Sequence, residues 1–537
     1  MASPEIILAA AEAGHIVTAA AGTHVGTHGA THHEAPGLMD IIRNNLPALQ
    51  VLVPLTLAPL ITLLNNRNLS WLLAMVGTSV SLLIAVVLTT QVLDGSVISY
   101  ALGNWAPPLG IELRVDAANA LVLLIVAAIG TCAAIYARPS VDKELGMTEQ
   151  PLFYTAFLLC FSGLLGVTIT GDAFNLFVFL EISSLSTYAL VAMGAKQDRR
   201  ALNAAYNYLI LGTVGATFYV IGLGLAYMMT GTLNMADLAQ RLPDLMGSGT
   251  LWVAFGFITI GLATKLAMFP LHFWLPNAYT YAPSVVTGFL AATATKVAVY
   301  ALIRFIFTVF GADFAVEAQL FGKVLLPLGL IGIIAGSLVA IWQVNAKRIL
   351  AFSSVAQIGY MLVGLGLMSL TGLTATMLHM FNHALMKGAL FFALGAVMWK
   401  LGGVTLDKMR GAGKLMPWTM AAFVGGGLSL VGVPTTVGFI SKWYLLNAAF
   451  EREWYWLIAI LLITSLMAAV YMWRVFEVAY LRPAPEGVQK GEAPLLLLIP
   501  TWALVLANFW FGLNATTTVN LAETAARGLL GLTGGAN

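Results

Sequence analysis

Lysine, glutamate and histidine side chains occur inside long apolar runs of this sequence, where charged groups are rare. The lysines among them are Lys265, Lys296, Lys387 and Lys442. A charged side chain at the centre of a bilayer costs ~2.5–3.5 kcal/mol on insertion scales. Each lysine therefore needs a carboxylate, a water-filled cavity, or the freedom to be neutral part of the time. Because a lysine that alternates between charged and neutral forms can pass a proton to a neighbour, these residues predict a proton relay.

A carboxylate also lies well inside an apolar run. Glu181 stands about two turns into the run FNLFVFLEISSLSTYAL. Its natural partner is one of the buried lysines, because an opposite charge stabilises both groups. A plain ion pair between helices and a lone protonated acid are the alternatives to a site that moves protons.

A stripe of polar residues follows in LHMFNHALMKGALFF. His379, His383 and Lys387 fall at i, i+4 and i+8 and so share one helix face. Histidine titrates near neutral pH, which makes the stripe a candidate relay. A zinc pair or structural histidines are the alternatives, but no HExxH glutamate is present. The sequence also lacks a CxxC cluster and a Walker A loop, so we expect no metal, no cofactor and no enzymatic centre.

Composition predicts that these residues lie in a membrane protein. Of 537 residues, 59% are hydrophobic and 9% are charged, whereas soluble domains carry about 25% charged residues. Many apolar runs are long enough to cross a hydrocarbon core of about 30 Å. They are too long for barrel strands, so we expect an all-α membrane protein. The net charge of +2 gives no indication of nucleic acid binding, and Cys132 and Cys160 lie inside spans.

Hydropathy predicts about fourteen transmembrane helices. The expected spans are Leu46–Leu64, Leu69–Leu93, Val115–Tyr136, Leu152–Thr170, Phe174–Met193, Ala205–Thr230, Leu251–Phe269, Pro283–Phe310, Val324–Val344, Leu350–Leu370, Leu373–Trp399, Pro417–Leu446, Trp454–Tyr480 and Pro494–Gly512. Residues 46–150 would hold helices 1–3 with an extended outer segment, and residues 481–537 helix 14 and a tail. Residues 1–45 are expected to be an N-terminal extension, in which several histidines leave metal binding open beside a loose, weakly helical tail.

The distribution of basic residues predicts the orientation. Connections that follow odd-numbered spans carry 15 lysines and arginines, whereas the opposite side, termini included, carries 6. Because cytoplasmic loops are enriched in basic residues, both termini are expected outside, with the chain in the inner membrane of a bacterium. The basic residues left inside spans are the four lysines and Arg304. Arg304 lies towards the end of its helix and is expected to reach the headgroups.

Lys265 and Lys442 share a further feature, since each lies in a span that contains a proline. Pro270 interrupts the seventh span and Pro434 the twelfth. Breaks of this kind are tolerated where they line a cavity. Because the breaks lie five spans apart, helices 4–8 (residues 151–310) and helices 9–13 (residues 323–480) are expected to form two inverted repeats, an arrangement typical of transporters.

At these residues the sequence resembles the antiporter-like membrane subunits shared by respiratory complex I, membrane-bound hydrogenases and Mrp-type Na⁺/H⁺ antiporters. The similarity runs roughly from Arg114 to Arg482. It rests on motifs that follow in the same order, namely GDAFNLFVFLEISSLSTYAL, TKLAMFPLHFWLPNAYTYAPSVVTGFLAATATKVAVY, NAKRILAFSSVAQIGYM, LHMFNHALMKGALFF and SLVGVPTTVGFISKWYLL. The sequence of these motifs is most similar to that of the Mrp D subunit, although Asn277 stands where many relatives have Asp.

The resemblance implies roles for the candidate residues. Glu181 would pair with Lys265, Lys296 and the two histidines would form a central hydrophilic axis, and Lys442 would be the site of the second half. The implied function is proton translocation within a multi-subunit Na⁺/H⁺ antiporter. The implied partners are other membrane subunits, protons, Na⁺ and the lipid bilayer, with no nucleic acid.

Three other functions stay open on the sequence alone. A proton-pumping subunit of a redox complex would be encoded beside quinone-active or hydrogen-active subunits. A stand-alone transporter of an organic solute would be active as the isolated chain. A structural scaffold predicts that Lys442→Ala harms assembly rather than ion flux.

Overall fold

The computed structural model describes residues 38–487 and 489–532. The histidines of the expected N-terminal extension lie outside the described residues. The end of that extension forms a short helix, α2 (Leu38–Asn44).

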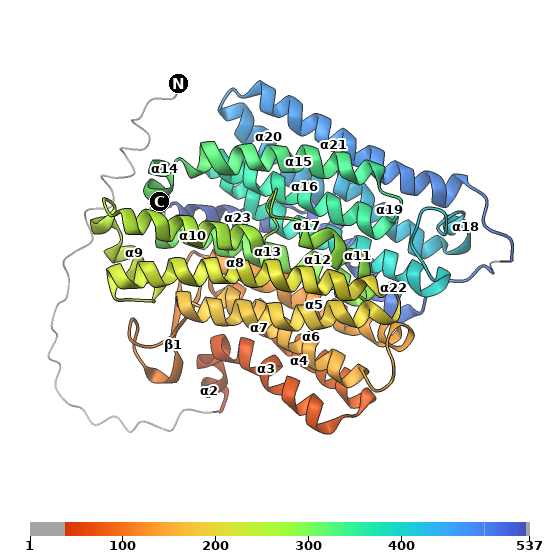
Figure 1. Ribbon diagram of the computed structural model, residues 1–537, viewed down its shortest axis with the longest axis horizontal. Coiled ribbons are helices and arrows are strands. Elements are labelled where there is room, and N and C mark those ends of the chain that lie inside the picture. The colour runs from red at the N-terminus through yellow and green to blue at the C-terminus, as the bar shows by residue number, and fades with distance from the viewer. Residues whose placement is uncertain (1–37, 488, 533–537) are drawn as a thin grey trace.

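The described chain is a bundle of helices that run along its long axis (Figure 1). The first half contains α3 (Leu46–Leu64), α4 (Arg67–Gln91), β1 (Ile98–Ala101), β2 (Glu112–Val115), α5 (Ala117–Glu144), α6 (Gln150–Ile169), α7 (Ala173–Ala192), α8 (Arg200–Thr230), α9 (Met235–Arg241), α10 (Gly249–Lys265), α11 (Trp274–Tyr281), α12 (Ser284–Ala292), α13 (Ala294–Ile303) and the π-helical η5 (Arg304–Val309). The second half contains α14 (Ala312–Glu317), η6 (Phe321–Leu325), α15 (Leu326–Trp342), α16 (Ala346–Gly366), α17 (Leu370–Leu401), α18 (Ala412–Leu415), α19 (Pro417–Val431), α20 (Val437–Glu451), α21 (Tyr455–Phe476), η7 (Glu477–Leu481), α22 (Leu495–Leu513) and α23 (Thr516–Leu529).

Within the described residues, 12 helices are long and apolar enough to cross a membrane. The shorter apolar helices α10 and α19 are the first halves of the two spans that the sequence predicts to be broken. The expected class, an all-α membrane protein with broken helices, is confirmed. The count of fourteen spans stays a prediction, because length and composition alone identify twelve.

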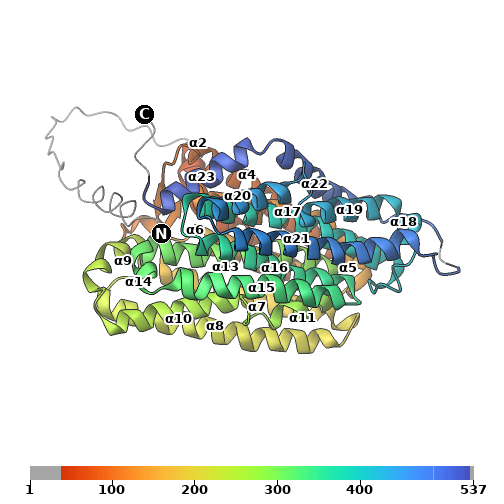
Figure 2. The same cartoon turned by 90° about the horizontal axis from the view of Figure 1, so that it is seen from above.

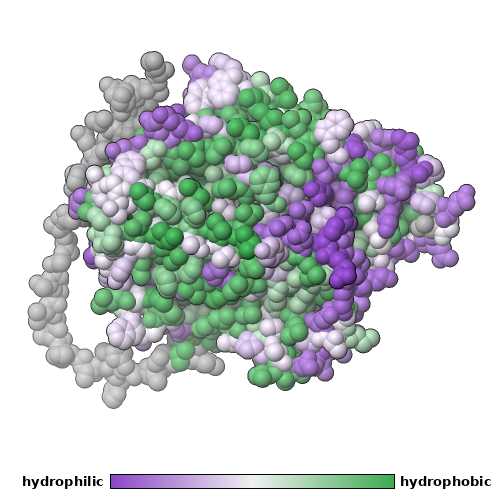
Figure 3. All heavy atoms as spheres, viewed as in Figure 1, coloured by the Kyte–Doolittle hydropathy of each residue, from purple (hydrophilic) through white to green (hydrophobic). Residues whose placement is uncertain are grey.

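Hydrophobic and hydrophilic residues occupy different parts of the surface. Figure 3 shows a broad hydrophobic area with hydrophilic residues concentrated towards the end of the bundle that carries α18. The hairpin strand β1 and the short helices α9 and α14 lie at the other end (Figure 1). Connections that follow even-numbered and odd-numbered spans are thus separated, as the charge distribution predicts.

The stretch before the third span is more ordered than expected. β1 and β2 pair as an antiparallel hairpin, from Ile98 opposite Val115 to Ala101 opposite Glu112. Val115, the expected start of the third span, therefore belongs to a strand. The helix α5 begins two residues later, because the Asp116 side chain accepts hydrogen bonds from the first backbone N–H groups of α5.

Helix α17 runs through the interior of the bundle (Figure 2). Every residue from Gly372 to Val397 is buried. A helix that is buried on all sides is surrounded by other helices, and α17 packs against α12, α16, α19, α20 and α22. It therefore connects the two halves of the molecule.

Two matching patterns at opposite ends of the bundle support an inverted repeat. Asp172 caps α7 and forms a bridge with Asn234, just beyond the end of α8. Asn345 caps α16 and forms a bridge with Thr405, just beyond the end of α17. The first pattern adjoins α9 and the second lies towards α18 (Figure 1). Helices five positions apart thus carry the same cap and the same bridge in opposite orientation.

The seventh and twelfth spans are broken, as expected. α10 ends at Lys265, and α11 begins only at Trp274. α19 ends at Val431, and α20 begins at Val437. The eighth span differs from its expected continuous form, since Thr293 leaves helical geometry (φ −120°, ψ −60°) between α12 and α13.

Candidate functional site

The pair of Glu181 and Lys265 lies at the first break. Lys265 Nζ is 3.1 Å from Glu181 Oε1 and donates a second hydrogen bond of 2.7 Å to Ser184 Oγ. The side chains of lysine and glutamate are 7% and 22% exposed. The structure thus brings together two residues that lie on separate helices, α7 and α10.

The break itself exposes backbone groups that side chains then satisfy. Lys265 is the last residue of α10, and Pro270 lies in the loop that follows. The indole N–H of Trp274 donates to the Thr264 carbonyl oxygen at 3.0 Å. Because Trp274 is itself buried and stacked on Tyr208, with ring centroids 4.0 Å apart, the end of α10 is fixed in position.

Lys296 lies at the unexpected break of the eighth span. It is fully buried, and its ammonium donates hydrogen bonds to the Ala291 carbonyl oxygen and, at 3.3 Å, to Thr295 Oγ1. The interruption at Thr293 leaves the Ala291 carbonyl free of a regular helical partner. A break and a buried lysine therefore occur together for a second time.

The histidine stripe lies on the buried helix α17. His379 Nδ1 is 2.9 Å from Ser441 Oγ, and His379 Nε2 is 3.0 Å from Gln357 Oε1. The rings of His379 and His383 are nearly parallel, with centroids 6.0 Å apart. Neither ring nitrogen of His383 has a hydrogen-bond partner among the described residues. One histidine is thus held by two bonds, and the next is free to accept or donate a proton.

Lys387 continues the stripe towards α16. Its ammonium donates to the Leu350 carbonyl oxygen at 2.7 Å and to Ser353 Oγ. Helix α12, in the first half of the eighth span, and α16 both pack against α17. The eighth span, α16 and α17 thus meet in one buried polar region.

Lys442 lies at the last break, one and a half turns into α20. Its ammonium donates to the carbonyl oxygens of Leu430 and Val431, at 3.1 and 2.8 Å, and to Ser465 Oγ at 3.0 Å. The two carbonyls are left free because α19 ends there. Ser441, the neighbour of Lys442, contacts His379, so the stripe on α17 leads to this lysine.

The four lysines inside the expected spans differ in their ion pairs. Lys265 pairs with Glu181, whereas Lys296, Lys387 and Lys442 form no ion pair with any described carboxylate. Their ammonium groups bind carbonyl and hydroxyl oxygens instead. A charge without a counter-ion is costly at this depth, and these three groups are therefore suited to carrying a proton transiently.

Arg304, expected to extend towards the headgroups, is bound within the protein. Its side chain is 8% exposed and forms a bidentate ion pair with Asp116, with both distances 2.8 Å. The carboxylate at the start of α5 gives the guanidinium a buried partner. An Asp three residues before Asn119 is typical of a helix cap, but this pattern does not reveal Arg304 as the partner of Asp116.

Glu144 and Lys347 are buried residues that the sequence does not reveal. Lys347, expected in a cytoplasmic connection, lies in the first turn of α16 and donates to Ala282 O at 3.2 Å and Ser284 Oγ at 3.3 Å. Glu144 Oε2 accepts from the Ser284 backbone N–H at 2.9 Å. Both line a cavity of about 240 Å³. Their positions at helix ends made them look exposed.

The histidine stripe on α17 does not supply a complete set of metal ligands among the described residues. Among residues 38–487 and 489–532, no group of three histidine, cysteine, aspartate or glutamate side chains is arranged to hold an ion. The contacts of His379 are those of a hydrogen-bonded imidazole.

The chain is similar to known membrane proteins along most of its length. A family described as "NADH:quinone oxidoreductase/Mrp antiporter, TM" matches residues 170–468. The chain is 44% identical over 454 residues to an NADH-quinone oxidoreductase N subunit from Desulforudis audaxviator, covering 84% of this chain and 89% of the relative. It is 31% identical over 474 residues to a Na(+)/H(+) antiporter D subunit from Alkalihalophilus pseudofirmus, covering 88% and 94%.

Solved structures give the same result. A chain of the Mrp complex from Dietzia is similar with a TM-score of 0.82 at 26% identity, covering 92% of this chain and 98% of that one. A chain of an archaeal membrane-bound sulfane sulfur reductase has a TM-score of 0.83 at 31% identity, covering 90% and 98%. Both neighbours are subunits of multi-subunit membrane complexes. The chain belongs to the NADH:quinone oxidoreductase/Mrp antiporter transmembrane family.

Proposed function

We propose that this protein is the proton-translocating subunit of a multi-subunit monovalent cation (Na⁺)/proton antiporter. Protons move between the pair Glu181–Lys265 and Lys442 by way of Lys296 and the stripe of His379, His383 and Lys387. The observation that carries the proposal is the buried line of lysines and histidines across both halves, in which three lysines form no ion pair with a described carboxylate.

The mechanism follows from the cost of a buried charge. Lys265 is stabilised in its charged form while Glu181 lies 3.1 Å away. Separation of the pair would remove that stabilisation, and the proton would move on to Lys296. From there the unpaired His383 and the hydrogen-bonded His379 lead towards Lys442. These steps need no redox or hydrolytic centre in this subunit.

The experiment replaces each member of the pair in the assembled complex. Glu181→Gln and Lys265→Met are expected to lower ΔpH-driven transport in vesicles about tenfold or more, an effect of about 1.4 kcal/mol on the barrier. The exposed pair Glu149–Lys196, whose charged atoms are 2.8 Å apart, provides matched controls in Glu149→Gln and Lys196→Met. Undiminished transport in either Glu181→Gln or Lys265→Met would sink the proposal.

A proton-pumping subunit of an NADH–quinone or related redox complex is the second candidate. The 44% identity to a relative named as an NADH-quinone oxidoreductase subunit favours it. The same pathway residues would then serve a redox reaction in other subunits. Purification of the protein and identification of its partners separates the two, because quinone-active or hydrogen-active subunits would accompany a redox machine and cation-antiporter subunits an antiporter.

The location and organisation of the chain belong to this proposal. The chain lies in the inner membrane of a bacterium with both termini outside, because the connections rich in lysine and arginine would then face the cytoplasm. Residues 151–310 and 323–480 are the two repeats, preceded by helices 1–3 and followed by helix 14. Other membrane subunits cover the hydrophobic sides that lipid does not.

A further inference from the structure

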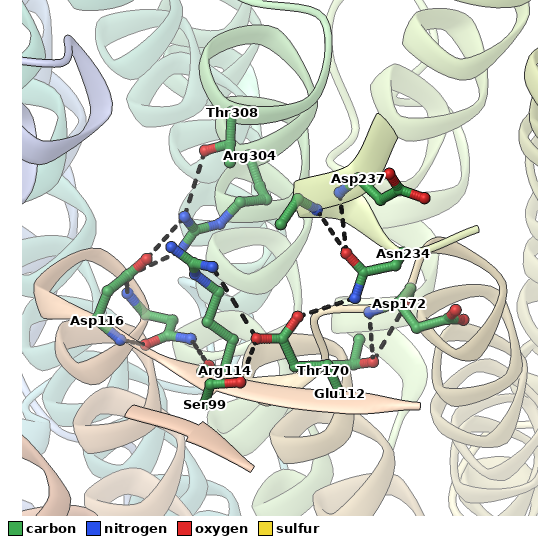
Figure 4. A network of polar contacts seen from close by, with 12 residues as sticks. Ser99, Glu112, Arg114, Asp116, Thr170, Asp172, Asn234, Asp237, Arg304 and Thr308 are labelled. Atoms are coloured by element: carbon green, nitrogen blue, oxygen red, sulfur yellow. Dashed lines mark hydrogen bonds and ion pairs between the residues drawn. The ribbon is translucent and has the colours of Figure 1, made fainter. Parts of the chain in front are cut away.

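A polar network closes the end of the bundle that carries β1, β2 and α9. Figure 4 shows Arg304 between Asp116 and Thr308, with Arg114 beside it and Glu112 beyond. Arg304 donates to Tyr300 Oη at 3.1 Å and to Thr308 Oγ1 at 3.3 Å, in addition to its two bonds to Asp116. The guanidinium is therefore fixed by partners on three sides.

A cavity of about 180 Å³ lies against this network. Among the described residues that line it, the charged ones are Arg114 and Arg304, and Tyr300 also contributes to its wall. Asp116 does not line this cavity but a second one, of about 210 Å³, on the other side of the two arginines. Two guanidinium groups therefore face the cavity beside Tyr300, while their carboxylate partners Asp116 and Glu112 are not among its lining residues.

Polar side chains recur along the eighth span between the centre of the molecule and this cavity. Lys296, Tyr300, Arg304 and Thr308 follow at steps of four along α13 and η5 and so lie on one side of the eighth span. Tyr300 is one turn, or ~6 Å of helix rise, from Lys296. A polar side chain thus occurs at each turn from the central lysine to the cavity, and Tyr300, Arg304 and Thr308 are joined by hydrogen bonds.

The central lysine is turned away from these side chains in the structure. Its ammonium binds the Ala291 carbonyl oxygen, on the opposite side of its own α-carbon from Tyr300. A lysine side chain has several rotatable bonds and can turn to the other side. Access from Lys296 to the cavity therefore depends on a change of its rotamer.

We propose that this end of the eighth span is a proton port, running from Lys296 past Tyr300 into the cavity, and that Arg304 and Arg114 are its charge barrier. The inference rests on the proposed function, since it adds a solvent end to the same pathway. Arginine keeps its charge at every physiological pH, so the barrier is permanent. Hydronium and Na⁺ are both repelled by it, and passive leak through the port is suppressed. Asp116 holds Arg304 in place from the side away from the cavity.

The test is the passive proton permeability of vesicles that contain the assembled complex, with an imposed pH gradient and no Na⁺ or other cation available for exchange. Arg304→Gln combined with Asp116→Asn removes the guanidinium from the cavity wall without leaving an unpaired carboxylate. We expect the leak to rise about tenfold or more, whereas Arg304→Lys, which keeps the charge, should stay near the wild-type leak. Arg241→Gln with Asp237→Asn is the matched control, because this pair lies at the same end and its arginine is half exposed.

The proposed port is contradicted if the proton leak of the assembled double variant stays at the wild-type value. It is also contradicted if the leak rises equally in the Arg241/Asp237 control. Should the double variant not assemble, Arg114→Gln gives the second measurement, since Arg114 is partly exposed and its loss leaves Glu112 bonded to Ser99 and Asn234. A leak in Arg114→Gln supports the port, and its absence overturns it. Glu181→Gln in the same vesicles distinguishes the port from the proposed function, because this variant is expected to lower cation-coupled proton transport and to leave the passive leak unchanged.

Discussion

Three of the buried lysines are held in the same way. The ammonium groups of Lys296, Lys387 and Lys442 each bind a backbone carbonyl oxygen and a side-chain hydroxyl. Such neutral partners satisfy the donors but offset only part of the cost of the charge. Loss of a proton from any of them therefore leaves a lysine that the site also tolerates. This tolerance of both charged and neutral forms is what a relay requires.

The two histidines of α17 play unequal parts. His379 is held in one orientation, because its two ring nitrogens contact Gln357 and Ser441. His383 has no such partners among the described residues, and it lies near Lys296 and Lys387. His383 therefore suits the step between the lysines, and His379 the step towards Lys442.

At the level of elements, the broken helices create the sites of the lysines. α19 ends at Val431, and the carbonyls freed there receive the ammonium of Lys442 from α20. The two half-helices can approach so closely because Gly438 has no side chain. A Cβ at Gly438 would lie 1.8 Å from the Ser429 carbonyl oxygen.

Gly438→Ala is therefore expected to destabilise the assembled subunit. The clash is with backbone rather than a flexible side chain, and overpacking of this kind costs about 1–3 kcal/mol. Lys442 lies one turn beyond Gly438, so transport should fall as well. Thermal unfolding of the purified complex and transport in vesicles measure the two effects.

Gly256→Ala on α10 is the matched control for that substitution. A Cβ at Gly256 would meet nothing within 4 Å, and alanine favours a helix by about 1 kcal/mol over glycine. Stability should stay equal or rise. A stable, fully active Gly438→Ala protein would show that the close approach of α19 and α20 is unimportant.

Breaks in the helices could be predicted from the sequence where a proline marks them. Pro270 and Pro434 predict the two broken spans, because proline has no backbone N–H to donate in a helical hydrogen bond. The break at Thr293 has no proline or glycine beside it and was not predicted. Tertiary contacts decide such a break, and Lys296 contributes by binding the Ala291 carbonyl.

The same limit explains the site residues that were missed. Hydropathy reports that Glu144 and Lys347 stand near helix ends, but not that other helices cover them. Arg304 was misplaced for a related reason, since its partner Asp116 comes from a segment far away in the chain. A single sequence shows which residues are unusual, whereas their partners depend on the packing.

At the scale of the whole molecule, the two repeats place a polar core inside an apolar body. The matching bridges Asp172–Asn234 and Asn345–Thr405 lie at opposite ends of the bundle, and α17 lies between the halves. A pathway that follows α17 therefore runs from one repeat to the other. On the proposed pathway, an event at Glu181 in the first half would affect Lys442 in the second.

The proposed orientation leads to a prediction about the whole chain. Fusions of a reporter that is active only outside the cytoplasm should be active at either terminus, because both ends are expected outside. The same reporter inserted after Lys408, in a basic connection beside α18, should be inactive. The measurement is reporter activity in intact cells. Opposite results for the two termini would refute an even number of spans.

The central claim is that the buried lysines pass protons, and Lys442→Arg tests it most directly. Arginine keeps the positive charge and the hydrogen-bond donors but does not release its proton at physiological pH. Proton transport by the assembled complex in vesicles should fall about tenfold or more, while assembly is kept. Lys408→Arg, on a lysine that also binds a carbonyl oxygen at a helix end, should transport normally. Wild-type proton transport by the Lys442→Arg complex would contradict the account and leave Lys442 a structural role.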